Sequence, residues 1–209
     1  MKMLRGVLLL GLTAGLAFGQ YKTESAGAPP SELGSGITAI LQGEGIRIVG
    51  AKGPLMEVWL RKDLPTGRQY PEEATSFDQI PQGALMGVIR YNANGQDRRG
   101  QVLKSGLYTL RYSMFPINGD HQGVAPQRDF LLVSPAASDQ DAAATLDFDT
   151  LVDMSTTATG TPHPGVLSIW KASDDSSPGF EKDGDHDWVL RSTIGDKKIA
   201  IILIGTADH

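Results

Sequence analysis

Apolar and polar residues alternate along much of this chain with the period of two that is typical of β-strands. The pattern is clearest over residues 106–115, where one face carries Tyr108, Leu110, Tyr112 and Met114. The other face carries Thr109, Arg111 and Ser113. Because successive side chains of a strand point to opposite faces, this segment predicts a strand with one side on a core. We therefore expect Tyr108, Leu110 and Tyr112 to be buried.

Eight short segments have strand character and are separated by Gly, Pro, Asn and Asp, the residues that favour turns. They are residues 45–50, 55–62, 84–92, 106–115, 129–134, 165–171, 188–194 and 198–205. A stretch rich in Ala, Asp and Thr, residues 138–161, predicts a helix around 147–154. The pattern predicts an all-β protein: an antiparallel β-sandwich or jelly roll of about eight strands with one short helix.

An eight-stranded outer-membrane barrel is a second interpretation of this strand count. Such a barrel needs strands of about 10 residues with aromatic girdles at both ends. The aromatic residues of this chain lie within strands beside other apolar residues. This distribution favours the sandwich.

The N-terminal residues have the features of a cleaved secretory signal peptide in their usual order. Lys2 and Arg5 precede an uncharged apolar run over 6–18, and small residues occupy positions 17 and 19. This run is shorter than the roughly 20 residues of a membrane-spanning helix, so a retained anchor is the weaker interpretation. We expect a signal peptide over 1–19, a flexible linker over 20–36, and a β-sandwich domain over 37–209. The prediction is a secreted or periplasmic protein with a mature N-terminus at Gln20 and no membrane span.

Composition narrows the classes of partner. Loss of Lys2 and Arg5 leaves 17 of the 19 basic residues against 24 acidic ones, a formal charge of −7. An acidic surface argues against nucleic acid and anionic lipid, which both attract basic patches. The chain has no cysteine, so neither disulfides nor a lipidated cysteine is available.

Residues 104–110 read Lys-Ser-Gly-Leu-Tyr-Thr-Leu. The Gly-x-Tyr-x-Leu part resembles the strand opening of small exported β-sandwich modules, such as transthyretin-like and carboxypeptidase-regulatory-like domains. The whole chain also resembles exported bacterial proteins of an uncharacterised family. These resemblances imply a sandwich fold and carry over no functional residue.

The densest group of acidic residues lies over 181–187. Asp183, Asp185 and Asp187 alternate there, and His186 lies between the last two. Oxygen ligands at every second residue can wrap a calcium ion. The loop departs from an EF-hand because Trp188 replaces the glycine and Ile194 replaces the closing glutamate. Two interpretations remain: a generic calcium site, or a hairpin turn at Asp183-Gly184 whose acidic neighbours keep an edge loop hydrated.

A second loop has a similar sequence. Asn118-Gly119-Asp120-His121 and Asp183-Gly184-Asp185-His186 each place Asp-His after a turn dipeptide. Should the two loops meet, Asp120, His121, Asp185 and His186 could bind zinc. This arrangement predicts, as an alternative function, a metal-dependent hydrolase that uses the two Asp-His loops. Calcium is the first candidate cofactor and zinc the second.

Signs of other catalysis are few. The chain has no Gly-x-Ser-x-Gly motif and no cysteine nucleophile. Glu57 lies in a predicted strand, where it could serve as one of two glycosidase carboxylates. A cross-strand ion pair with Arg47, Arg90, Arg111 or Arg191 is the simpler prediction.

These observations favour an exported non-catalytic binding or structural module over an enzyme. Its partner could be a glycan, a peptide or another component of the cell envelope. The three tryptophans could form a sugar-binding platform, although their positions within strands favour packing in the core.

Overall fold

The computed structural model describes residues 21–67, 75–115 and 128–207 of the chain. One antiparallel sheet of ten strands forms the body, in the order β1-β2-β3-β4-β7-β8-β9-β12-β11-β10. Its strands are β1 (Lys22–Gly27), β2 (Gly45–Gly50), β3 (Gly53–Leu60), β4 (Leu85–Tyr91), β7 (Gly106–Met114), β8 (Asp129–Pro135), β9 (Gly165–Lys171), β10 (Gly179–Asp183), β11 (Asp187–Ile194) and β12 (Lys197–Ile204). A small separate hairpin pairs β5 (Gly95–Gln96) with β6 (Val102–Leu103).

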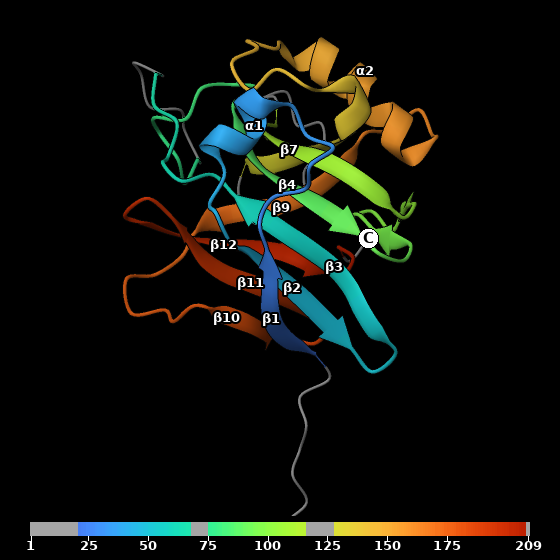
Figure 1. Cartoon of the computed structure of the whole chain (residues 1–209), viewed down its shortest axis with the longest axis vertical. Coiled ribbons are helices and arrows are strands. Elements are labelled where there is room, and N and C mark those ends of the chain that lie inside the picture. The colour runs from blue at the N-terminus through green and yellow to red at the C-terminus, as the bar shows by residue number, and fades with distance from the viewer. Residues whose placement is uncertain (1–20, 68–74, 116–127, 208–209) are drawn as a thin grey trace, which may run out of the picture.

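The large sheet curls until its two edge strands approach each other, so the fold is a nearly closed barrel rather than a sandwich (Figure 1). Aromatic rings join the edges. Tyr21, just before β1, packs edge-on against Trp188 of β11 at 4.6 Å and against Phe180 of β10 at 5.7 Å between ring centroids. The predicted eight-stranded sandwich or jelly roll is therefore wrong in architecture, although the all-β antiparallel class is confirmed.

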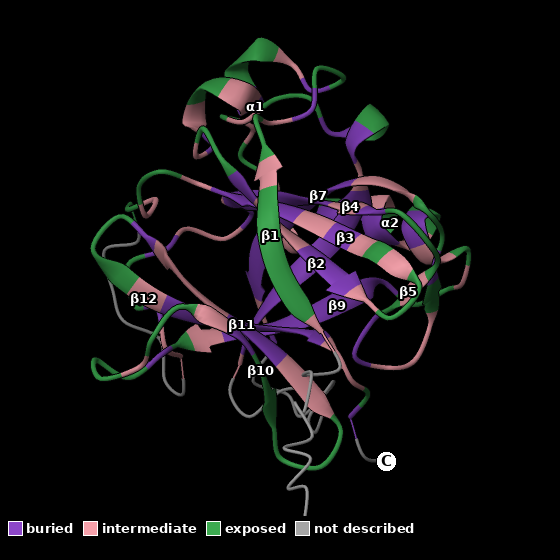
Figure 2. Cartoon of the chain, turned by 60° about the horizontal axis from the view of Figure 1, so that its bottom comes forward, coloured by how far each residue is buried: buried purple, intermediate pink, exposed green. Residues whose placement is uncertain are grey.

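Every one of the eight predicted strands is present, with ends that differ by no more than two residues. The sequence analysis missed both edge strands, β1 and β10, and the short β5–β6 hairpin. Strand β1 lies within the segment that we expected to be a flexible linker, and it pairs with β2 from Lys22 to Gly27. Most residues of β1 are exposed, as Figure 2 shows, so their composition resembles that of a linker.

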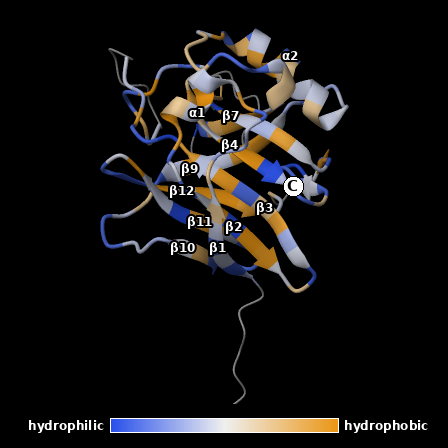
Figure 3. Cartoon of the chain, viewed as in Figure 1, coloured by the Kyte–Doolittle hydropathy of each residue, from blue (hydrophilic) through white to orange (hydrophobic). Residues whose placement is uncertain are grey.

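The interior of the barrel is filled by one apolar core. Tyr108, Leu110 and Tyr112 are buried there as predicted, and they pack with inward residues from both halves of the sheet, such as Ile48 and Ile201. Figure 3 shows this hydrophobic character along the strands. Because both halves supply side chains to one core, the curled sheet buries them without a second sheet.

Short helices and loops cover part of the outer surface. Helix α1 (Ser35–Ile40) places Ile37 against Trp59 and Val88, on the outside of β3 and β4. Helix α2 (Phe148–Thr159) lies on β8 and β9, and its Ser155 hydroxyl donates to the Val133 carbonyl at 2.6 Å. The 3-10 turn η1 (Ala136–Ser138) precedes it.

Helix α2 confirms the helix predicted around 147–154. The Asp147 side chain accepts a hydrogen bond from the Thr150 N–H and caps the N-terminus, and Gly160 ends the helix in the left-handed region at φ 66°. No helix among residues 21–67, 75–115 and 128–207 is long and apolar enough to cross a membrane.

Candidate functional site

The acidic segment 181–187 forms the hairpin between β10 and β11. Asp183 pairs with Asp187 across the strands, and the turn consists of Gly184, Asp185 and His186. Gly184 has a φ of 63°, a left-handed conformation that glycine adopts without strain. This geometry is the hairpin turn that the sequence offered as the alternative to a calcium loop.

Two carboxylates of this hairpin bind arginines. Asp187 Oδ1 accepts from Arg98 Nη1 at 2.6 Å, and Asp183 Oδ2 accepts from Arg191 Nη2 at 2.9 Å. Asp185 and His186 are exposed at the tip. Within the described part of the chain, no three His, Asp or Glu side chains gather closely enough to hold a metal ion. The calcium site stays a prediction, and these ion pairs favour the hydrated turn.

The other half of the predicted zinc site, Asp120 and His121, lies outside the described residues. The structure therefore does not test whether the two Asp-His loops meet. His163, between two prolines, is exposed in the loop before β9.

The outer surface of β2, β3 and β4 carries the ion pairs predicted for Glu57. Arg47 Nε donates to Glu57 Oε1 at 2.7 Å, and Arg90 Nε lies 3.9 Å from Glu57 Oε2. Arg90 also bonds Glu32 at 2.9 Å. Both carboxylate oxygens of Glu57 thus face arginines, which supports a structural role.

The tryptophans do not form a shared platform. Trp59 is buried under α1 and donates from Nε1 to the Gly27 carbonyl at 2.9 Å. Trp188 packs with Phe180 at 5.6 Å, next to the junction of the barrel edges. Trp170 lies beside the apolar group of β11 and β12 on the outer surface.

A buried aspartate holds the β5–β6 hairpin over one end of the barrel. Asp97 accepts from the Gln101 N–H at 2.8 Å, from the Gln101 side-chain amide at 2.8 Å and from the Val166 N–H at 3.2 Å. The next residue, Arg98, hydrogen-bonds the backbone of Val166 and Ala207 and makes the ion pair with Asp187. These bonds join the small hairpin to β9, β11 and the C-terminal segment.

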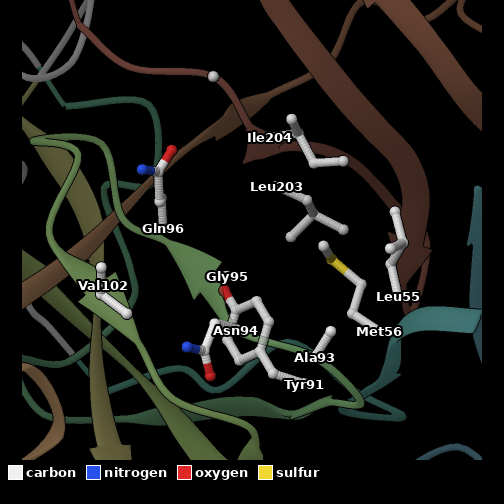
Figure 4. Close-up of a pocket in the computed structure, with 11 residues that line it drawn as sticks. Leu55, Met56, Tyr91, Ala93, Asn94, Gly95, Gln96, Val102, Leu203 and Ile204 are labelled. Carbon is white, nitrogen blue, oxygen red and sulfur yellow. The ribbon is translucent and has the colours of Figure 1, made fainter.

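Beneath this hairpin lies a pocket of about 300 Å³, hereafter the mouth pocket (Figure 4). The ends of three barrel strands and the small hairpin line it: Leu55, Met56, Tyr91, Ala93, Asn94, Gly95, Gln96, Val102, Leu203, Ile204 and Gly205. None of these side chains is charged. Leu55 and Met56 come from β3 and face Leu203 and Ile204 of β12 across the barrel.

Two features make this pocket unlike the rest of the surface. Val102, on its rim, is 49% exposed and stands out among the described residues as a large apolar side chain in water. Tyr91, at its floor, is 1% exposed, and its hydroxyl has no hydrogen-bond partner within the described part of the chain. A buried hydroxyl without a partner is uncommon in proteins and is costly.

The ring of Tyr91 is held in place from two sides. It packs edge-on against Tyr108 at 5.9 Å, and Gly95 lies so close that a Cβ there would overlap the ring. Burial, with smaller effects of Asp97 and Tyr108, raises the pKa of the Tyr91 hydroxyl. The hydroxyl therefore remains a neutral hydrogen-bond donor.

Comparison of the chain with protein-family models, with curated proteins and with solved structures found no match. The Gly106-Leu107-Tyr108 opening does begin strand β7, but the barrel-like sheet differs from the sandwich that its resemblance implied.

The sequence analysis missed the mouth pocket entirely. Its lining comes from four separate segments, each of which is too short to show a pattern. The one local signal was Val102, an apolar residue in a polar, turn-rich stretch. On its own that residue does not distinguish a rim from a strand interior.

Proposed function

We propose that this protein is an exported, non-catalytic binding protein that holds a small, mostly apolar molecule in the mouth pocket. The observation that carries the proposal is the combination of an uncharged, apolar concavity and an exposed Val102 on its rim. Ligand pockets of soluble proteins are mostly apolar, contain few polar groups and often lie at the mouths of β-barrels. The signal-peptide pattern of residues 1–19 supports export to a secreted or periplasmic location.

The absence of charge in the pocket argues for binding over catalysis at this place. General acid–base chemistry needs a titratable group within reach of the substrate. Here the tyrosine hydroxyl is the one titratable group in the lining, and burial moves it further from titration near neutral pH. Glycans, which the sequence left open as partners, present many hydroxyls and are poorly matched to these walls.

A metal-dependent hydrolase receives less support. The carboxylates of Asp183 and Asp187 already bind Arg191 and Arg98. A cation held by this hairpin without a second loop would have to displace both arginines or bind through Asp185 and His186, which are too few ligands for a calcium or zinc site.

The proposal is tested with ethylbenzene, a small uncharged hydrocarbon, added to the purified mature protein and followed by NMR chemical shifts. Binding should shift the methyl signals of Met56 and Leu203 and leave those of the α2 side chains unchanged. Val102→Asp places a charge on the rim at an exposed position. It should weaken binding by roughly tenfold, equivalent to about 1.4 kcal/mol.

Thr145→Asp is the matched control, because it adds the same charge at an exposed position before α2. It should leave ethylbenzene affinity within about twofold. Equal losses in the two variants would show an effect of overall charge and count against the mouth pocket.

A further inference from the structure

We propose that an extended peptide segment of a partner, basic on its outward face, binds as an added strand in the gap between the two edges of the sheet. The site is separate from the mouth pocket and does not depend on the ligand proposed there. Three observations carry the inference: two free strand edges that face each other, a cleft with short walls between them, and a negative charge beside the cleft that has no partner.

The two edge strands have free backbone groups. Strands β1 and β10 end the sheet and are not paired with each other. Along the described chain each is paired on one side, β1 with β2 and β10 with β11. The other side of each strand presents N–H and C=O groups that no neighbouring strand uses, which is a template for strand addition. Figure 2 shows that most of β1 is exposed.

The two edges touch at one end and separate at the other. Tyr21 closes the first end through its ring contacts with Phe180 and Trp188. Farther along β1, a cleft of about 580 Å³ lies between the edges, hereafter the edge cleft. It runs beside three residues of β1 but only the first residue of β10, so we expect the added strand to pair with β1.

The walls of the edge cleft leave the backbone accessible. Thr23 and Ser25 of β1 have short, exposed side chains, and Gly179 of β10 has none. A Cβ added at Gly179 would find its nearest contact beyond its chain neighbours at 3.7 Å, in the Glu181 side chain. Walls this short let an incoming backbone approach to the roughly 4.8 Å that separates paired strands.

The floor of the edge cleft is apolar. Ile46 of β2 and Leu190 of β11 line it, and both pack with the core inside the barrel. Because the side chains of a strand alternate between its two faces, an added strand directs every second residue toward this floor and the others to solvent. We therefore expect the partner segment to alternate, with its apolar residues on the inward face.

The charges at the edge cleft favour a basic outward face. Glu24, Glu44 and Arg191 are the charged residues that line it. Glu24 pairs with Lys22 at 2.6 Å, and Arg191 pairs with Asp183 at 2.9 Å. Glu44 is exposed, and within the described part of the chain it has neither an ion pair nor a side-chain hydrogen bond. A basic residue of the partner would meet this carboxylate, and the acidic surface of the whole chain would attract it.

A free segment fits the edge cleft better than an edge strand of a second copy. In another copy, β1 has β2 at its side and β10 has β11. Either strand, placed in the cleft, would bring that neighbour onto the opposite edge, where the first copy already lies. An extended segment with no folded strand beside it avoids this overlap.

The test uses the peptide acetyl-Lys-Val-Lys-Val-Lys-Val-amide, titrated into the purified mature protein by calorimetry and NMR. Binding should shift the backbone amide signals of Thr23, Ser25 and Gly179 and leave that of Val102 unchanged. The same peptide with glutamate in place of each lysine should bind roughly tenfold more weakly at low salt, because it meets an acidic surface.

Two N-methylated forms of the peptide test strand pairing itself. The N–H groups of alternate residues in a strand point to opposite edges. Methylation of the three valine nitrogens therefore blocks one edge of the peptide, and methylation of the three lysine nitrogens blocks the other. Pairing with β1 should lower the affinity of one form by about tenfold or more and leave the other close to the parent peptide. Equal affinities of the two forms would overturn strand addition.

Glu44→Lys tests the charge at the cleft. It should weaken binding of the lysine peptide by roughly 3- to 10-fold, an effect that shrinks as salt rises. Asp153→Lys is the matched control, because it makes the same change at an exposed position of α2, and it should stay within about twofold. Equal losses in the two variants would assign the effect to net charge and not to the edge cleft.

The wild-type measurements decide the inference even where a variant does not fold. Absence of binding at millimolar peptide, or shifts at the mouth pocket in place of the β1 edge, would overturn it and leave the proposed function standing. Self-association seen by sedimentation, with shifts at Thr23 and Ser25 that grow with protein concentration, would assign the free edge to a second copy instead.

Discussion

Arg111 and Glu57 both lie on the outward face of the sheet, but their surroundings differ. Arg111, on β7, is completely buried under the segment that follows η1. Glu57, on β3, faces neighbouring arginines at a surface that retains contact with water, and its own side chain is 12% exposed. The same alternation of the sequence thus leads to a sealed charge in one region and a hydrated ion pair in the other.

Around Arg111, an ion pair and hydrogen bonds compensate the buried charge completely. Arg111 makes two bonds of 2.6 Å to the carboxylate of Asp139, and its remaining N–H groups donate to the carbonyls of Gly83, Asp141 and Ala144. Thr109 adds a bond of 2.6 Å to Asp139. Every donor of the guanidinium therefore has an acceptor, which is what a buried arginine requires.

The hydrated region needs no such completeness. Arg47 is 33% exposed in its side chain, so water can solvate it when Glu57 is absent. Ion pairs that keep some contact with water contribute less to stability than fully buried ones. The position of a charged residue in a strand pattern thus predicts the face on which it lies, whereas its contribution to stability depends on what covers that face.

The largest effect is expected for Arg111→Leu. This change leaves the Asp139 carboxylate buried without its counter-charge, which typically destabilises a protein by about 3–5 kcal/mol. Urea denaturation measures the difference. Arg47→Leu is the matched control and should cost about 1 kcal/mol or less. Similar losses in the two variants would show that burial of Arg111 does not make its ion pair more important than that of Arg47.

A somewhat smaller effect is expected for Leu110→Ala, next to Arg111 but facing the interior. Leu110 is fully buried, so truncation loses its transfer free energy and leaves a cavity, at a cost of about 2–5 kcal/mol. Leu107→Ala, at a half-buried position of the same strand, should cost less. Coinciding denaturation midpoints for Leu110→Ala and wild type would show that the barrel interior is not the core.

Glu57→Gln tests the ion pairs on the outer surface of β2, β3 and β4. It keeps the shape of the side chain and removes the charge that faces Arg47 and Arg90. We expect a loss of about 0.2–1 kcal/mol that shrinks as salt rises, because exposed charges are screened. Denaturation at low and high sodium chloride measures both quantities. A large loss that does not respond to salt would show that Glu57 behaves like the sealed pair.

The smallest effect is expected at the β10–β11 hairpin. A calcium site there would raise stability by about 2.7 kcal/mol at a hundredfold excess over Kd, and the rise would vanish in Asp185→Asn. Because Asp183 and Asp187 bind arginines, we expect the melting temperature to stay unchanged in millimolar calcium or zinc. A rise that Asp185→Asn or His121→Ala removes would establish the metal site in place of the hydrated turn.

Local patterns gave the strands that contribute apolar side chains to the core. Residues 45–50 and 165–171 were predicted with the bounds that the structure shows. The helix was predicted from composition, and its Asp147 cap lies at the first residue expected. These elements can be predicted because each buries an apolar face, so that apolar residues recur along its sequence with a regular spacing.

The edge strands β1 and β10 left no such signal. Most of their residues are exposed, and the strands are held by backbone hydrogen bonds to β2 and β11, which depend little on side-chain identity. The joining of the two edges through Tyr21, Phe180 and Trp188 also leaves no local signal, because Tyr21 is far along the chain from the other two residues. That joining is what distinguishes a curled barrel from a sandwich.

For function, the amino-acid composition alone establishes the acidic character of the chain, and the N-terminal residues carry a signal-peptide pattern. The hairpin turn at Asp183-Gly184 was one of two interpretations that the acidic segment allowed. Folding is what brings Arg98 and Arg191 to the hairpin carboxylates, and it is what brings four short segments together around the mouth pocket beneath β5 and β6. Periodicity and turn preferences reflect interactions between residues that are close in the sequence. A pocket or a compensated buried charge depends on residues that are distant in the sequence and meet only when the chain folds.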